Sequence, residues 1–168
     1  MHQFTASSET RPRDLAVYRE RLTPSLKILA GAAIVAPMVA LVAVPIDQTV
    51  SLSIGLAVAV LLIAVMVAVA PVVEVSGREL RAGRAHIDVA YLGEAVGHRG
   101  DEGRRARGVG LDPRGWYLIR GGIEGVVVVE NTDPDDPVTS WTISTRTPDR
   151  VIAALRRAQR AAAEQDAR

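Results

Sequence analysis

The residues that could bind a metal ion are few and lie far apart in the chain. Three carboxylates gather at Asp133, Asp135 and Asp136, but this run lacks a loop glycine and a closing glutamate at calcium-loop spacing, and two prolines constrain it. His86 and His98 have no second histidine at ligand spacing, and the chain has no cysteine. We therefore expect a solvated turn at the acidic run, and we predict no metal and no cofactor.

Groups that could act in catalysis show no recognisable arrangement. Ser144 precedes Arg146 by two positions, but no G-x-S-x-G elbow surrounds it and no base can be assigned to it. Gly108 and Gly110 lack the third glycine and the following helix of a dinucleotide-binding loop. We predict no catalytic residue, and hence a protein that is not an enzyme.

Arginine offers a better candidate for binding. Six arginines cluster in one charged loop and the strand after it: Arg99, Arg104, Arg105, Arg107, Arg114 and Arg120. Near a cytoplasmic leaflet, such a loop would bind anionic lipid headgroups or an acidic protein surface. Asp101, Glu102 and Asp112 dilute the charge, so a loop that is only solvated is the alternative.

Two further arginines, Arg19 and Arg21, precede the first apolar run of the chain. There they would meet anionic headgroups, each contributing about 1 kcal/mol near the surface, or would act only as topology determinants. The candidate lipid or partner contacts are Arg19, Arg21, Arg99, Arg104, Arg105 and Arg107. The net charge of +1 gives no reason to expect nucleic acid binding.

A long apolar stretch, residues 28–73, would position these arginines, and Asp47 is its only charged residue. It divides into runs at 28–46 and 50–71, each close to the roughly 20 residues that cross a bilayer. Neither run has a polar face, and a chain of 168 residues has no soluble core large enough to bury two such helices. We predict a transmembrane hairpin of two helices; a pair of hydrophobic strands in a soluble domain is the alternative.

The flanks of the hairpin predict its orientation. Arginines and Lys27 stand before the first run, Arg78, Arg81 and Arg84 follow the second, and the tip between the runs has neither lysine nor arginine. The positive-inside rule then predicts a multi-pass plasma membrane protein with both termini in the cytoplasm. Small residues at four-residue spacing would form the seam between the helices: Ala32, Ala36, Ala40, Gly55 and Ala59.

The rest of the chain divides by composition. Residues 1–13 are polar without apolar periodicity, and we expect disorder. Residues 14–27 form a juxtamembrane segment in which Leu15, Tyr18 and Leu22 recur at helical spacing, which predicts a short amphipathic turn at the membrane surface. Residues 72–163 read as short strands, a loop over 99–110 and a helix over 148–163 that Thr147 caps, followed by a tail at 164–168. Among the strands we expect one over 72–76, a hairpin of 80–82 and 85–87 around Gly83, and a valine-rich strand over 125–130 that is buried on both faces.

The predicted fold class is a membrane α-helical hairpin plus a small α+β cytoplasmic domain. That domain would be an antiparallel sheet or partial barrel with a C-terminal helix. Its element order is similar to that of bacterial pleckstrin-homology-like (PH-like) domains.

Several stretches together resemble a known family. They are YRERLTPS from Tyr18, APVVEV from Ala70, residues 77–80, residues 107–119, and DPDDP leading into WTISTRTP from Trp141. Jointly they are similar to an actinobacterial family of small membrane proteins known as domain of unknown function 3093. The resemblance covers the chain from about Tyr18 to Ala158. It implies two membrane helices and a cytoplasmic domain, but no activity and no catalytic residues.

These patterns favour a membrane-anchored, non-enzymatic interaction module. Its cytoplasmic domain would contact a partner protein or an anionic lipid surface. The alternative is an accessory subunit of a membrane enzyme or transporter that acts through its transmembrane helices. The expected partners are the lipid bilayer, anionic headgroups, an unidentified membrane or cytoplasmic protein, and a second copy of the chain in a homo-oligomer.

Overall fold

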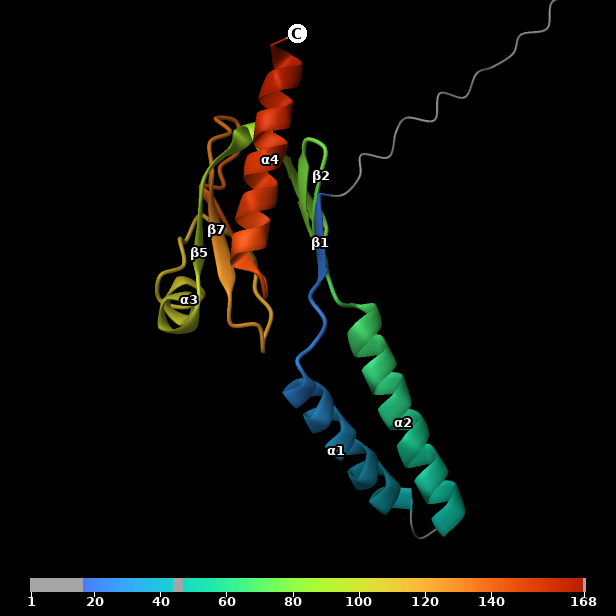
Figure 1. The fold of residues 1–168 in the computed structure, drawn as a ribbon. Helices are drawn as coiled ribbons and strands as arrows, with labels where there is room; N and C mark the ends of the chain where they lie inside the picture. The colour runs from blue at the N-terminus through green and yellow to red at the C-terminus, as the bar shows by residue number, and fades with distance from the viewer. Residues whose placement is uncertain (1–16, 44–46, 168) are drawn as a thin grey trace, which may run out of the picture.

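The computed structural model describes residues 17–43 and 47–167. It combines a pair of long helices with an α+β domain of two four-stranded sheets and a C-terminal helix (Figure 1). The mixed α+β class predicted for the domain is therefore confirmed. The disorder predicted for residues 1–13 lies outside the described residues.

The two long helices, α1 (Leu26–Ala43) and α2 (Gln48–Ala68), pack side by side as an antiparallel pair that projects from the domain (Figure 1). Asp47 caps α2, because its carboxylate accepts hydrogen bonds from the amides of Thr49 and Val50 at 2.7 and 3.0 Å. We refer to α1 and α2 together as the helical hairpin.

Small residues form the seam of the helical hairpin. Gly55 and Ala59 on α2 and Ala40 on α1, all predicted for this role, are buried, whereas Ala32 is only half-buried. Ala36, also predicted, lies outside the described side chains. Ser51 continues the four-residue spacing on α2, and its hydroxyl donates to the carbonyl of Ala40. A serine hydroxyl satisfied in this way lets a polar residue sit inside an apolar contact.

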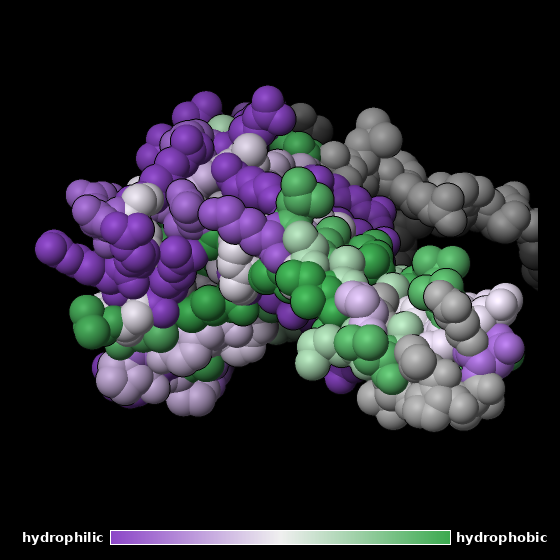
Figure 2. All heavy atoms as spheres, turned by 90° about the horizontal axis from the view of Figure 1, so that it is seen from below, coloured by the Kyte–Doolittle hydropathy of each residue, from purple (hydrophilic) through white to green (hydrophobic). Residues whose placement is uncertain are grey.

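Length and composition single out α2 as a membrane-spanning candidate. Residues Thr49–Ala68 are long and apolar enough to cross a membrane, and only a small share of this stretch is buried. The apolar part of α1, Leu26–Leu41, is shorter. Large apolar side chains point outward from both helices, and Leu41 and Leu56 are 70% and 67% exposed. Seen from the hairpin side, the helices are mostly hydrophobic or neutral, while hydrophilic residues concentrate over the domain (Figure 2).

Sheet A is antiparallel, with strand order β1-β2-β3-β4. Its strands are β1 (Tyr18–Arg21), β2 (Val72–Ser76), β3 (Glu79–Ala82) and β4 (Ala85–Asp88). The predicted β2 and the predicted β3–β4 hairpin are confirmed, with Gly83 at φ +65° in the turn, where glycine avoids the steric cost of a left-handed backbone.

β1 corrects the prediction for the juxtamembrane segment. Residues 18–21 form an edge strand paired with β2, and no amphipathic helical turn is formed there. Tyr18 and Leu22 are four positions apart, a spacing that fits one helical face but equally fits alternate positions of a strand. Pairing with β2 decides between the two, because it satisfies the backbone of this segment and buries Leu22 completely. The domain therefore begins before the helical hairpin rather than after it.

Sheet B has strand order β5-β7-β8-β6 and is mixed, since β6 runs parallel to β8 while the other pairs are antiparallel. Its strands are β5 (Leu92–His98), β6 (Trp116–Leu118), β7 (Val126–Asn131) and β8 (Ser140–Ser144), and a short 3-10 helix, η1 (Val89–Tyr91), leads into β5. The valine run of β7 is buried largely on both faces, as predicted. Trp116 and Trp141 stack at a centroid distance of 4.4 Å across the parallel pair.

The segment 99–110, predicted as a loop, contains the short helix α3 (Gly100–Ala106). Asp101 and Glu102 occupy its first turn and Arg104 and Arg105 its last, which complements the helix dipole. Gly103 permits the packing, because a Cβ at this position would lie 2.7 Å from the carbonyl oxygen of Glu124. The charge and glycine content of this segment predicted a loop, because the contact between Gly103 and Glu124 cannot be read from the local sequence.

The C-terminal helix α4 (Pro148–Asp166) contacts strands of both sheets and completes one core (Figure 1). Its buried face includes Val151, Ala154, Leu155 and Ala158. α4 runs to Asp166, so the tail predicted to begin at residue 164 is wrong. Ala162 is still buried near the end of the helix, and the Asp166 carboxylate in its last turn pairs with Arg78 at 2.5 Å.

Candidate functional site

Both ends of the helical hairpin enter adjacent strands of sheet A. Arg21, the last residue of β1, stands opposite Val72, the first residue of β2. The Leu22 amide donates to the Pro71 carbonyl at 2.9 Å, which continues the pairing beyond the strands. The Arg21 guanidinium donates to the carbonyl of Ala68 at 3.0 Å. The negative end of the helix dipole at the C-terminus of α2 favours a cation at this position. The sheet therefore connects both helices to the domain directly.

Glu20 is the centre of a polar cluster at this junction, and only 13% of its side chain is exposed. One carboxylate oxygen accepts from the hydroxyls of Tyr18 and Thr145 at 2.6 and 2.5 Å. The other accepts from the backbone amide of Arg146 at 3.0 Å and faces its guanidinium at 3.5 Å. A carboxylate so nearly buried is tolerated because charged and neutral donors surround it.

Arg146 extends this cluster toward the start of α1. Its guanidinium donates to the carbonyl of Thr23 at 2.6 Å and to that of Arg21 at 3.3 Å. The first of these carbonyls lies in the segment between β1 and α1, and the second belongs to the last residue of β1. Arg146 precedes α4 by two residues, so one side chain joins the root of the helical hairpin to the root of α4.

Tyr18 adds a second connection to the start of α4. Its phenol donates its only proton to Glu20, so the hydroxyl of Thr147, 2.8 Å away, must donate to the phenol oxygen. Thr147 occupies the N-cap position of α4 as predicted, but its side chain makes no capping hydrogen bond. Burial, and then the hydrogen bond to the Glu20 carboxylate, raises the pKa of Tyr18 above its ordinary value of 10.0.

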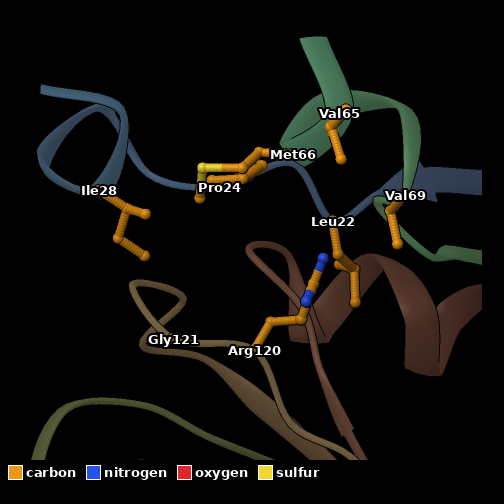
Figure 3. A pocket seen from close by; sticks show the side chains of 8 residues that line it. All are labelled: Leu22, Pro24, Ile28, Val65, Met66, Val69, Arg120 and Gly121. Carbon is orange, nitrogen blue, oxygen red and sulfur yellow. The ribbon is translucent and has the colours of Figure 1, made fainter. Parts of the chain in front are cut away.

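A cavity of about 320 Å³ lies between the helical hairpin and the domain. Leu22 and Pro24 come from the segment before α1, and Ile28 from its first turn. The other lining residues come from the end of α2 and from the connection between β6 and β7: Val65, Met66, Val69, Arg120 and Gly121. Figure 3 shows the Arg120 side chain reaching from that connection toward Leu22. The walls are apolar, and Arg120 carries the only charge among them.

Most of the arginines predicted to contact lipid or a partner are engaged within the chain. Arg19 pairs with Glu74 at 3.6 Å on sheet A, and Arg99 pairs with Asp149 at 2.7 Å. Arg104 pairs with Asp101 one turn away on α3. These three side chains remain more than half exposed, so their pairs are weak and do not remove them from a surface role.

The remaining predicted arginines differ from one another. Arg21 donates to α2 as described above, and Arg107 donates to the carbonyl of Ile123, which fastens α3 to the connection between β6 and β7. Arg105 is exposed and has no ion pair within the described part of the chain. The structure therefore divides the six arginines between sheet A and α3 rather than gathering them in one site.

The acidic run forms a turn held by its own side chains. The carboxylate of Asp133 accepts from the amide of Asp135 at 3.0 Å, and that of Asp136 accepts from the amide of Val138 at 2.9 Å. His98 faces Glu102 at 3.6 Å, and the hydroxyl of Ser144 accepts from the amide of Arg120 at 3.0 Å. No group of three metal-ligating side chains is found in the residues that the structure describes.

Sequence reasoning missed Glu20 and the isolation of Arg120 within the arginine cluster. Tyr18, Glu20 and Leu22 alternate along one face of β1, and a carboxylate between two apolar residues on such a face indicates a buried polar group. That signal was available in the sequence. The distant partners of Glu20, Thr145 and Arg146, could not be read from the sequence, because they lie about 125 positions away.

Comparison with protein-family models gives a match over most of the chain. A family model described as "Protein of unknown function (DUF3093)" matches residues 17–155, from the residue before β1 into α4. No curated protein and no solved structure matches the chain. The matched region includes both segments of the Glu20 cluster, so the family model covers the whole junction.

Proposed function

The chain belongs to the DUF3093 family, which carries no assigned activity, and from its geometry we propose a membrane-anchored, non-enzymatic interaction module. The helical hairpin crosses the plasma membrane twice, and both of its ends lead into the cytoplasmic domain. The domain is held against the inner leaflet, where it contacts anionic lipid or a partner protein. The two sheets closed by a C-terminal helix support the analogy with PH-like domains.

The observation that carries this proposal is how the helical hairpin joins sheet A. In the sequence it lies between β1 and β2, two strands that pair directly, and only residues 22–25 and 69–71 connect it to them. Glu20 and Arg146 tie the same junction to α4. A domain connected in this way stays at a fixed height and orientation above the membrane, which suits surface contact better than capture of a distant partner.

The composition of the helical hairpin supports its place in a bilayer. Apolar side chains cover its outer faces, and these need a lipid or protein environment. Arg21 and Arg146 lie at its root, while the tip around Asp47 carries no cation in the sequence. α1 is short for a complete span, and Lys27 in its first turn would reach to the headgroups.

Membrane integration is tested by extracting cell membranes with alkaline carbonate, which removes peripheral proteins and leaves integral ones. The proposal predicts that the full chain stays in the pellet. A chain in which a flexible Gly/Ser linker replaces residues 24–69 should enter the supernatant. Release of the full chain by carbonate would contradict the proposal.

Exchange of the helical hairpin separates this function from the alternative of an accessory subunit. An unrelated two-helix anchor is placed between Thr23 and Ala70, and the proteins that co-purify from native membranes are compared with those of the original chain. A module acting through its domain retains its partners. Loss of all partners after the exchange would favour the accessory subunit, which acts through its membrane helices.

A further inference from the structure

The cavity between the helical hairpin and the domain lies at the level of the membrane surface if the proposed function holds. Val65, Met66 and Val69 belong to the last turns of α2, and Ile28 to the first turn of α1. At a rise of about 1.5 Å per residue, Val65 lies only about 6 Å along the helix from Val69. The cavity therefore spans the depth at which phospholipid headgroups give way to acyl chains.

The walls of the cavity are apolar and uncovered. Val69 is 70% exposed and Val65 49%, and both line the cavity opposite Arg120 (Figure 3). Burying such side chains contributes roughly 25 cal/mol per Å² of apolar surface, so an apolar ligand is favoured here.

Arg120 has an unusual position among the arginines of the junction. Arg21 and Arg146 donate to main-chain carbonyls at the root of the helical hairpin. The Arg120 guanidinium forms no hydrogen bond or ion pair with any residue that the structure describes, although the residue is half-buried. No carboxylate lines the cavity with it. The site thus offers five N–H donors and one positive charge without a counter-ion.

The backbone around Arg120 is held by contacts with β8 and with the start of α1. The Arg120 amide donates to the hydroxyl of Ser144, a fully buried side chain on β8, at 3.0 Å. Gly122 has φ +78°, and a Cβ on it would collide with the side chain of Ser25. Glycine there lets the connection between β6 and β7 approach the start of α1 closely, which closes one side of the cavity.

We propose that this cavity binds one anionic phospholipid of the inner leaflet. Its phosphate accepts hydrogen bonds from Arg120, and one acyl chain lies along Val65, Met66 and Val69. Guanidinium groups bind phosphate oxygens in a bidentate manner, and the apolar wall continues from Arg120 toward the bilayer interior. The inference rests on the proposed function, because the wall meets acyl chains only if the helical hairpin lies in a membrane.

Native mass spectrometry of the full chain released from nanodiscs tests this inference. The nanodiscs contain phosphatidylcholine alone or phosphatidylcholine with phosphatidylglycerol, and bound lipid is counted per protein. We expect one retained phosphatidylglycerol in preference to phosphatidylcholine. Arg120→Gln should weaken apparent phosphatidylglycerol binding about fivefold, the equivalent of about 1 kcal/mol, and remove the preference. Arg160→Gln, at an exposed position on α4, is the matched control and should change neither the binding of phosphatidylglycerol nor the preference for it.

A second variant tests the apolar wall. Val69→Ser should weaken the binding of both lipids to a similar extent, because it removes apolar contact with the acyl chain and leaves Arg120 in place. Inorganic phosphate is added as a separate probe. If phosphate binds without lipid, or displaces phosphatidylglycerol, the site is a soluble-anion site and the lipid inference is wrong.

The remaining outcomes distinguish the inference from the proposed function. Equal retention of phosphatidylglycerol by the original chain and by Arg120→Gln would overturn the inference. So would the absence of any retained lipid on a chain that resists carbonate extraction, while the membrane anchor itself would stand. A chain that carbonate releases from membranes would overturn both.

Discussion

Glu20 and Arg146 lie 126 positions apart in sequence, and the carboxylate of the first accepts the backbone amide of the second at 3.0 Å. Glu20 belongs to the strand that enters the helical hairpin, and Arg146 to the segment that enters α4. The guanidinium of Arg146 also donates to the carbonyl of Thr23, three residues before α1 begins. A shift of the helical hairpin relative to α4 would have to break these contacts, so the junction couples the position of one to the other.

Removing the charge of Glu20 should destabilise the domain. Glu20→Gln leaves the donors of Arg146, Thr145 and Tyr18 without a charged acceptor, and we expect the free energy of unfolding to fall by about 1–3 kcal/mol. Urea unfolding of the full chain in detergent, followed by fluorescence of Trp116 and Trp141, measures the change. The exposed Glu94 supplies the control, since Glu94→Gln should stay within about 0.5 kcal/mol.

A double-mutant cycle isolates the interaction between Glu20 and Arg146. Arg146 is 42% exposed, so the coupling energy should be modest, about 0.5–1 kcal/mol. Additive effects of Glu20→Gln and Arg146→Gln would show that the two side chains act independently and would contradict the coupled junction.

Close packing beneath the junction makes Gly125 sensitive to substitution. A Cβ at this position would collide with the carbonyl oxygen of Thr145 and lie 3.0 Å from Cγ of Pro148. Gly125→Ala should lower the free energy of unfolding by about 1–3 kcal/mol, because the obstacle is backbone and cannot rotate away. Gly121→Ala is the control, since its nearest neighbour would be Cδ1 of Ile28 at 3.8 Å. Equal stability of the two variants would refute this packing.

Stability at alkaline pH should depend on Tyr18. Burial and the Glu20 carboxylate raise the pKa of this phenol in the folded chain, so the folded state holds the proton more tightly than the unfolded state. The stabilisation is fully present below about pH 10 and is lost as pH rises through the raised folded value. Unfolding measured from pH 8 to 11 should show a steeper decline for the original chain than for Tyr18→Phe; parallel curves would contradict the assignment.

The domain should require β1 for folding although the helical hairpin separates that strand from the rest. Residues 72–168 alone lose the partner of β2 and the fully buried Leu22. A chain in which a short Gly/Ser linker replaces residues 24–69 retains both, because residues 22 and 71 are already hydrogen-bonded. We expect cooperative urea unfolding only for the linked chain. Equal stability of the fragment would show that β1 is dispensable.

Local pattern predicted much of the domain. The valine run of β7, the β3–β4 hairpin around Gly83 and the helix beginning at Pro148 carry their own signals in periodicity and turn chemistry. The predictions for the segments that form β1 and α3 are wrong for a different reason. Their short segments are compatible with several local structures, and contacts with β2 and with Glu124 select among them.

The candidate site was less predictable than the fold. Proximity in the sequence predicts an arginine cluster, but pairs such as Arg99–Asp149 join residues 50 positions apart. In the sequence Arg120 is only one member of that cluster, and its isolation from carboxylates depends on the helical hairpin lying beside it. Charge content can be read from a sequence, but the counter-ions that neutralise it depend on the fold.

Thiol labelling on intact cells tests the central claim most directly, because the chain has no cysteine of its own. One cysteine is placed at Gln48, at the tip of the helical hairpin, and another at Ala161, an exposed position on α4. A membrane-impermeant maleimide should label Gln48→Cys on intact cells and Ala161→Cys only after the cells are opened. Labelling of Ala161→Cys on intact cells, or of neither tip nor domain until the cells are opened, would contradict a hairpin that crosses the membrane and returns to a cytoplasmic domain.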